Sequence, residues 1–265
     1  MKDYRGIIAI DLDGTLLKDD GTISDFSVSV LKKAQESGYM VLLCSGRPYR
    51  AIKETYEAIG SDAPCVCYNG GLIFNPSDPA YPSKSYRFPR HDLEKLFAEA
   101  KPYCKGITYE DENDLYQNEE DPFLEQYFPK AGINAHLEEK PCPPFDPYTF
   151  IFHFEEESKA KIKELCAPYS SFKFRYWRGA PYGELFIPEA DKGNALKIVA
   201  KTHSISKNDI YAFGDSVNDK TMLEEAGHPY AMFGGKKALL EAGFPLTLKG
   251  NDEDGVALTI ESELL

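Results

Sequence analysis

The stretch Gly6-Ile7-Ile8-Ala9-Ile10-Asp11-Leu12-Asp13-Gly14-Thr15-Leu16 decides how the chain is built. Its apolar first half is typical of a strand buried on both faces, as the strands of a parallel sheet are. Two carboxylates one residue apart follow, and Gly14 lets the chain leave in a tight turn. Because ligands of open α/β sheets bind at the carboxyl ends of strands, this stretch predicts both a sheet and a functional site at its edge.

Apolar strands and helical patterns alternate after this stretch and again near the C-terminus. The expected strands are 39–44, 65–68, 210–213 and 230–233, and the expected helices are 24–37, a stretch ending at Gly60, 193–203 and 219–226. Such alternation predicts a parallel sheet with helices on both faces, here built from the two ends of the chain.

The middle of the chain has a different composition. Residues 84–187 hold 21 of the 34 aromatic residues in 104 of the 265 positions. Its expected strands are 85–88, 107–110, 115–118, 149–154 and 172–177, and its expected helices are 91–100 and 155–166. We therefore expect an α/β fold in which residues 1–83 and 188–265 form one domain and residues 84–187 form an inserted α/β domain.

Asp11 and Asp13 could perform chemistry together. A carboxylate nucleophile would divide the hydrolysis of a phosphate ester into two easier steps, and a second carboxyl group could transfer the protons. A solvated acidic turn is the simpler alternative, since Asp-Gly turns are common.

Two further carboxylates, Asp215 and Asp219, follow the expected strand 210–213. With Asp11 they would form a cluster of hard oxygen ligands suited to Mg²⁺. The alternative is an ordinary loop in which Asp219 caps a helix. Ser45 and Gly46 follow another strand and could bind phosphate oxygens, and Lys192 at a helix start offers a cation for the same purpose.

These motifs resemble those of the haloacid dehalogenase-like superfamily, and of its Cof-like phosphatases in particular, which carry a large α/β cap of type IIB. The resemblance implies a Rossmann-like catalytic core with the cap inserted between the second and third motifs. It makes Asp11 the nucleophile that forms an aspartyl-phosphate and Asp13 the general acid/base. The implied Mg²⁺ ligands are Asp11, the backbone carbonyl of Asp13, Asp215 and, at or near the metal, Asp219. The implied phosphate-binding residues are Ser45, Gly46, Lys192 and Asn218.

Two details add to this resemblance. Ser216 stands where many relatives have Asn, and its shorter side chain can still form a hydrogen bond. Asn69-Gly70-Gly71 resembles the family's Asn-Gly turn that leads toward the cap, and the resemblance implies that this turn lines the substrate entrance.

The expected function is Mg²⁺-dependent hydrolysis of a small phosphate ester, such as a sugar phosphate, a nucleotide or a cofactor phosphate. A phosphotransferase or mutase of the same superfamily would share these motifs, and a silent binding or regulatory module could share the fold. A receiver-like signalling domain would be about half as long and would lack the second acid. A dinucleotide-binding oxidoreductase would need a G-x-G-x-x-G turn, which is absent from the sequence.

Composition excludes several partners. The net charge of −13 disfavours nucleic acid, whose binding depends on Lys and Arg. No apolar run approaches the roughly 20 residues of a membrane span. The start of the chain lacks the pattern of a secretory signal, so we expect a cytoplasmic protein whose six cysteines are reduced. The acidic stretch 110–121 is expected to be a solvated surface. Oligomeric state is undetermined.

Overall fold

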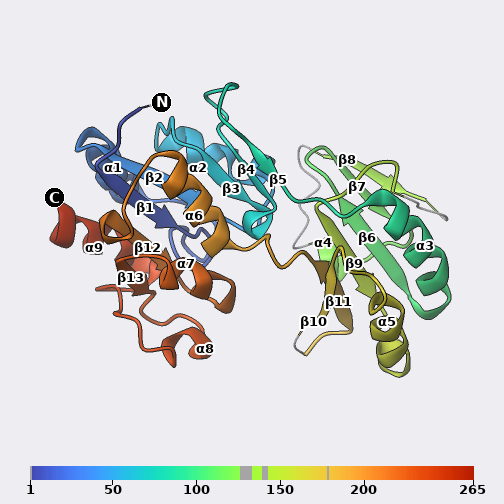
Figure 1. Ribbon diagram of the computed structural model, residues 1–265. Coiled ribbons are helices and arrows are strands. Elements are labelled where there is room, and N and C mark those ends of the chain that lie inside the picture. Colours follow the sequence, from blue (N-terminus) through green and yellow to red (C-terminus); the bar gives the residue numbers. More distant parts are fainter. Residues whose placement is uncertain (1, 126–132, 139–142, 178) are drawn as a thin grey trace. The chain divides into compact units, whose positions relative to one another are not determined.

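The computed structural model describes residues 2–125, 133–138, 143–177 and 179–265, and the chain divides into two compact units (Figure 1). The core domain comprises Met1–Ser85 and Ala190–Leu265, and the inserted domain comprises Tyr86–Glu189. Each junction lies two residues from the boundary expected from the sequence.

A seven-stranded sheet runs through the core domain in the order β13-β12-β1-β2-β3-β4-β5. Its strands are β1 (Gly6–Ile10), β2 (Tyr39–Cys44), β3 (Cys65–Cys67), β4 (Leu72–Phe74), β5 (Lys84–Ser85), β12 (Ile210–Gly214) and β13 (His228–Ala231). The five strands from β13 to β3 are parallel, whereas β4 and β5 add to the edge in antiparallel fashion. The carboxyl ends of β1, β2 and β12 therefore open onto one edge of the sheet.

Helices cover the core sheet. They are α1 (Asp25–Glu36), α2 (Lys53–Ala58), α6 (Lys192–Thr202), α7 (Lys220–Glu224), α8 (Lys237–Leu240) and α9 (Gly255–Leu264). Ile7 and Ala9 of β1 share a buried cluster with apolar residues of α6 and α7, which lie side by side (Figure 1). Ile8 and Ile10 alternate with them and are also fully buried, and α1 packs against β2 and α9. A strand that is buried at every position is what a sheet covered on both faces requires.

The inserted domain contains a separate six-stranded sheet in the order β10-β11-β9-β6-β7-β8. Its strands are β6 (Gly106–Glu110), β7 (Asp114–Gln117), β8 (Asn134–Leu137), β9 (Thr149–His153), β10 (Lys173–Tyr176) and β11 (Tyr182–Phe186), and its helices are α3 (Arg90–Ala100), α4 (Pro122–Glu125) and α5 (Lys159–Cys166). Figure 1 shows α3 and α5 on the same face of this sheet, where Phe150 and Phe152 of β9 contribute to an aromatic core. The α/β fold with an inserted α/β domain is thus confirmed.

Some expected elements differ from those observed. The predicted strand 85–88 is wrong beyond Ser85, because Lys84–Ser85 pairs with β4 in the core sheet and Phe88 packs in the core of the inserted domain. Strand β3 ends at Cys67, and Tyr68 instead begins a 3₁₀ turn. Strands β4, β8 and β11 and helices α4, α8 and α9 were not expected.

The prediction of a solvated surface over residues 110–121 is wrong at both ends, where Glu110 and Asp121 are buried. The Tyr182 hydroxyl donates to Asp121 Oδ1 at 2.9 Å, and His153 Nδ1 lies 2.8 Å from Asp121 Oδ2. Burial of a carboxylate is tolerated here because such partners replace water.

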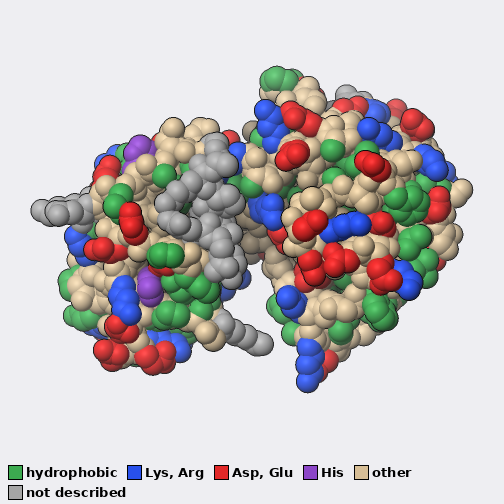
Figure 2. Space-filling view, turned by 180° about the vertical axis from the view of Figure 1, so that it is seen from behind, with side chains coloured by type: hydrophobic (Ala, Val, Ile, Leu, Met, Phe, Trp, Pro, Cys, Tyr) green, Lys and Arg blue, Asp and Glu red, His purple; other side chains and the backbone are tan. Residues whose placement is uncertain are grey.

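The surface and the cysteines agree with the composition. Figure 2 shows many exposed Asp and Glu side chains on the face of the core domain turned to the viewer, in keeping with the net charge of −13. The five cysteines among the described residues are free thiols, and Cys142 lies outside those residues. Within the described ranges, no helix has both the length and the apolar character needed to cross a membrane.

Candidate active site

Asp11 lies directly after β1 at the carboxyl edge of the core sheet. Its backbone N–H donates to Phe213 O at 3.0 Å, and its side chain accepts from the Thr15 hydroxyl at 3.2 Å. Asp11 is only 4% exposed. Burial raises its pKa to about 7, although the nearby Lys192 ammonium acts in the opposite direction. The carboxylate is thus fixed in orientation and depends on neighbouring cations for its charge.

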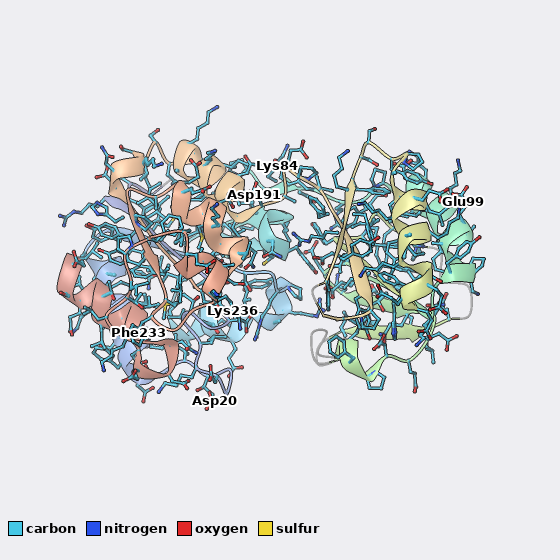
Figure 3. The ribbon with its side chains drawn as sticks, turned by 90° about the horizontal axis from the view of Figure 1, so that it is seen from below. Asp20, Lys84, Glu99, Asp191, Phe233 and Lys236 are labelled. Carbon is cyan, nitrogen blue, oxygen red and sulfur yellow. The ribbon has the colours of Figure 1, made fainter. Side chains whose placement is uncertain are left out.

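Lys192 is the first residue of α6. The helix begins there because the Asp191 side chain accepts from the backbone N–H groups of Gly193 and Asn194 at 2.9 and 3.1 Å, as an N-cap does (Figure 3). Lys192 Nζ donates at 2.5 Å both to Asp11 Oδ1 and to Asp219 Oδ1, and its side chain is completely buried. Burial acts to lower the Lys192 pKa, but the two carboxylates outweigh it and raise that pKa above its ordinary value.

Asp215 and Asp219 lie in the loop after β12. Asp219 Oδ2 accepts from the backbone N–H groups of Asp215 and Ser216 at 3.1 and 3.0 Å, while its other oxygen binds Lys192. Burial raises the pKa of Asp215 to about 6, and the negative charge of Asp219 adds to this shift. The backbone N–H of Lys236, labelled in Figure 3, donates to Asp215 O at 2.8 Å. Asp219 thus organises the loop that presents Asp215.

Three carboxylates meet at this edge of the sheet. Asp11, Asp215 and Asp219 each offer an oxygen, and these oxygens all lie within 4.8 Å of one another. All three residues are buried, and Lys192 is the one buried lysine or arginine among the described residues. A cluster of hard oxygen donors with excess negative charge fits a Mg²⁺ ion. The Asp13 carboxylate is not part of this cluster.

Asp13 instead faces Arg47, which follows the Ser45-Gly46 pair. Arg47 Nε donates to Asp13 Oδ2 at 2.8 Å, and Arg47 Nη2 donates to Asp13 Oδ1. The Asp13 side chain is 58% exposed, so it is far more accessible than Asp11. Sequence reasoning assigned no role to Arg47. Its place two residues after Ser45 was visible, but its partner depends on how β1 and β2 align.

Ser45 and Gly46 lie in the loop after β2, and Asn218 lies in the loop after β12. Ser45 is fully buried after β2, and its hydroxyl accepts from the Arg47 backbone N–H at 3.1 Å. Gly46 is exposed. Asn218 is also exposed, and its Nδ2 donates to Asn69 Oδ1 at 3.0 Å. Asn69 in turn donates its backbone N–H to Ser45 O at 2.9 Å, so it links both loops.

The model of the haloacid dehalogenase-like hydrolase family matches residues 8–260. The chain belongs to this family. Among curated relatives of these hydrolases, it is 29% identical over 257 residues to the 5-amino-6-(5-phospho-D-ribitylamino)uracil phosphatase YitU of Bacillus subtilis, covering 95% of this chain and 94% of that one.

Two further proteins are similar to this chain over nearly its whole length. The chain is 25% identical to the pyridoxal phosphate phosphatase YbhA of Escherichia coli, with 98% of each chain covered. A solved haloacid dehalogenase-like hydrolase from Bacteroides thetaiotaomicron superposes with a TM-score of 0.83 at 24% identity, covering 98% of this chain and 99% of that one. The resemblance expected from the motifs is thereby confirmed, and the chain is a phosphatase of the haloacid dehalogenase-like hydrolases.

Proposed function

We propose that this phosphatase hydrolyses a small phosphate monoester through an aspartyl-phosphate on Asp11. The observation that carries the proposal is the buried Lys192 ammonium, which lies 2.5 Å from both Asp11 and Asp219. This contact favours the ionised form of the Asp11 carboxylate within a buried site and leaves its second oxygen to the Thr15 hydroxyl. A fixed, charged carboxylate at the carboxyl edge of a sheet is suited to in-line attack.

The two carboxylates divide the chemistry. Asp11 attacks phosphorus, and the bond from phosphorus to the ester oxygen breaks while the Asp13 carboxylic acid gives that oxygen its proton. Asp13, now ionised, takes a proton from a water molecule whose oxygen attacks the phosphorus. The bond from phosphorus to Asp11 then breaks, which releases phosphate and regenerates both groups. The greater exposure of Asp13 suits a group that must meet a leaving alcohol and then water.

Charge neutralisation comes from the surrounding residues. Lys192, the Ser45 hydroxyl, the Gly46 backbone N–H and the Asn218 amide would bind the phosphate oxygens. Asp11, Asp215, Asp219 and the Asp13 carbonyl would hold Mg²⁺. When bound, Mg²⁺ supplies positive charge that screens the carboxylates from the phosphate and stabilises charge in the transition state.

The proposed substrates are small phosphorylated metabolites such as sugar phosphates, nucleotides or cofactor phosphates. Relatives named for a phosphoribitylamino-uracil and for pyridoxal phosphate support this range. The net charge of −13 supports a small substrate over a nucleic acid.

Phosphate release from p-nitrophenyl phosphate and a panel of small esters, with Mg²⁺ or with chelator, tests the proposal. Asp11→Asn should abolish turnover. Asp20→Asn is the matched control, because Asp20 lies in the exposed turn that follows the same strand and its side chain binds only Thr22 within the described residues (Figure 3). Turnover retained in Asp11→Asn, or equal rates with and without chelator, would contradict the mechanism.

A further inference from the structure

The turn Tyr68–Gly70, which follows β3, has an unusual backbone. Tyr68 and Asn69 have φ angles of 52° and 55°, in the left-handed region that residues other than glycine rarely adopt. Such conformations are retained where surrounding contacts hold them. Here the contacts are backbone hydrogen bonds to the loop after β2, from Tyr68 N–H to Arg47 O at 3.2 Å and from Asn69 N–H to Ser45 O at 2.9 Å.

The same turn touches the start of α6. Gly70 has a φ of 103°, and a Cβ atom on it would lie 2.5 Å from Asp191 O. Asp191 caps the helix that presents Lys192. The turn therefore packs against the Ser45 loop and against the helix that carries the buried lysine, so its position bears on both.

The Asn69 side chain lies between the two loops proposed to bind phosphate. Its Oδ1 accepts from Asn218 Nδ2 at 3.0 Å. The amide end of this side chain lies against Gly46, since a Cβ atom on Gly46 would lie 3.1 Å from Asn69 Nδ2 and 3.2 Å from Asn69 Oδ1. Within the described part of the chain, this Nδ2 donates no hydrogen bond. A free amide donor thus stands beside the exposed backbone of Gly46.

We propose that Asn69 is an additional residue of the phosphate site, in which Oδ1 positions Asn218 and Nδ2 donates to a phosphate oxygen of the substrate. This inference rests on the proposed function, because it takes Gly46 and Asn218 as phosphate-binding groups. The left-handed backbone conformation of Asn69 orients its side-chain amide toward the loops that carry Gly46 and Asn218. Asn is among the few residues other than glycine that adopt this conformation readily.

Two substitutions separate the proposal from a purely structural role. Asn69→Gly keeps the backbone conformation and removes both side-chain functions. Asn69→Asp keeps an acceptor for Asn218 but replaces the donor with a negative charge. The readouts are kcat and KM for p-nitrophenyl phosphate, the inhibition constant of inorganic phosphate, and the melting temperature. Ser204→Gly is the matched control, because Ser204 also has a left-handed φ, of 56°, but lies at the end of α6.

We expect Asn69→Gly to weaken inhibition by phosphate and to lower kcat/KM by about 10-fold or more, as for a hydrogen bond to a charged group. Inhibition by phosphate should be weaker still in Asn69→Asp, because its carboxylate repels phosphate. Ser204→Gly should match the wild type. Phosphate inhibition of Asn69→Asp equal to that of the wild type would overturn the donor role, since a structural role predicts that result.

A double-mutant cycle tests the positioning of Asn218. If Oδ1 acts through that residue, Asn69→Gly should have a smaller effect on kcat/KM in an Asn218→Ala background than in the wild type. If the two substitutions lower kcat/KM by factors that multiply in the double variant, Asn69 does not position Asn218. Both tests require an active wild type and an inactive Asp11→Asn variant. If this requirement is not met, the proposed function fails. If it is met and the Asn69 variants behave like the wild type, only the inference about Asn69 fails.

Discussion

Removal of the Lys192 ammonium gives the sharpest test of how the buried site is held together. Lys192→Met keeps the length and the apolar stem of the side chain but leaves Asp11 and Asp219 facing each other without a cation. Both carboxylates are buried, and the Lys192 side chain is 0% exposed. Breaking such a buried pair costs about 3–5 kcal/mol, because uncompensated charge remains in a medium of low dielectric. For a chain of this size, that corresponds to a fall in melting temperature of roughly 6–20 °C.

The assay is thermal and urea-induced unfolding in chelator at about pH 8, above the raised pKa of Asp11 of about 7, together with phosphate release in Mg²⁺. Lys197→Met is the matched control on the same helix, because Lys197 forms an exposed pair with Glu225 at 2.9 Å. We expect Lys192→Met to lose activity and stability, and Lys197→Met to retain both. A Lys192→Met protein as stable as the wild type in chelator would refute the reasoning.

Three further predictions concern the metal-free site, the turn after β3 and the half-buried imidazole of His203. Burial raises the pKa values of Asp11 and Asp215 to about 7 and about 6, so their contribution to stability is full below their unfolded pKa and is lost as pH rises through 6 to 7. Thermal unfolding should therefore show a larger stabilisation by Mg²⁺ at about pH 8 than at about pH 5, and an equal shift at both would contradict the assignment. Gly70→Ala should destabilise the fold by about 1–3 kcal/mol in urea titrations, because a Cβ atom would lie 2.5 Å from Asp191 O, whereas unchanged unfolding would show that the turn can shift. Burial lowers the pKa of His203, so the stability it contributes is present above the pKa of an unfolded histidine and falls as pH drops through the lowered value. The loss of melting temperature on acidification should be smaller in His203→Phe than in the wild type. An identical pH profile in the two proteins would show that His203 does not cause this loss.

Much of the site was predictable because each motif follows a strand of the parallel sheet. The apolar run before Asp11 and the strand before Asp215 indicate two strand ends, and carboxyl ends of parallel strands meet at one edge. That reasoning places Asp11, Asp215 and Asp219 near one another, and the structure brings their oxygens within 4.8 Å. The catalytic, metal-binding and phosphate-binding roles assigned to these residues remain predictions.

Other features depend on pairings that no local pattern reveals. Strand β4 has only three residues, and β11 contains Gly183, so neither gives a clear period. Glu110 and Asp121 read as part of a charged surface, yet both are buried, and Asp121 binds Tyr182, 61 residues away in sequence. The partner of a charged residue is a long-range property, which composition alone does not encode.

The contacts of Arg47 and Asn69 were not predicted for the same reason. Arg47 meets Asp13 across 34 residues, and Asn69 meets Asn218 across 149. The first contact joins the ends of the neighbouring strands β1 and β2, whereas the second joins the ends of β3 and β12, which are separated by two strands at the same edge. A systematic search for polar residues at strand ends would have added Arg47 to the candidates, although not its partner.

Chemical trapping at Asp11 tests the central claim most directly. Turnover of p-nitrophenyl phosphate in Mg²⁺ would be quenched and treated with borohydride, which reduces an acyl phosphate to an alcohol and converts Asp11 to homoserine. The account predicts homoserine at position 11 by mass spectrometry, only when both ester and Mg²⁺ are present and with Asp13 unmodified. Turnover without modification of Asp11, or with modification of another carboxylate, would contradict it.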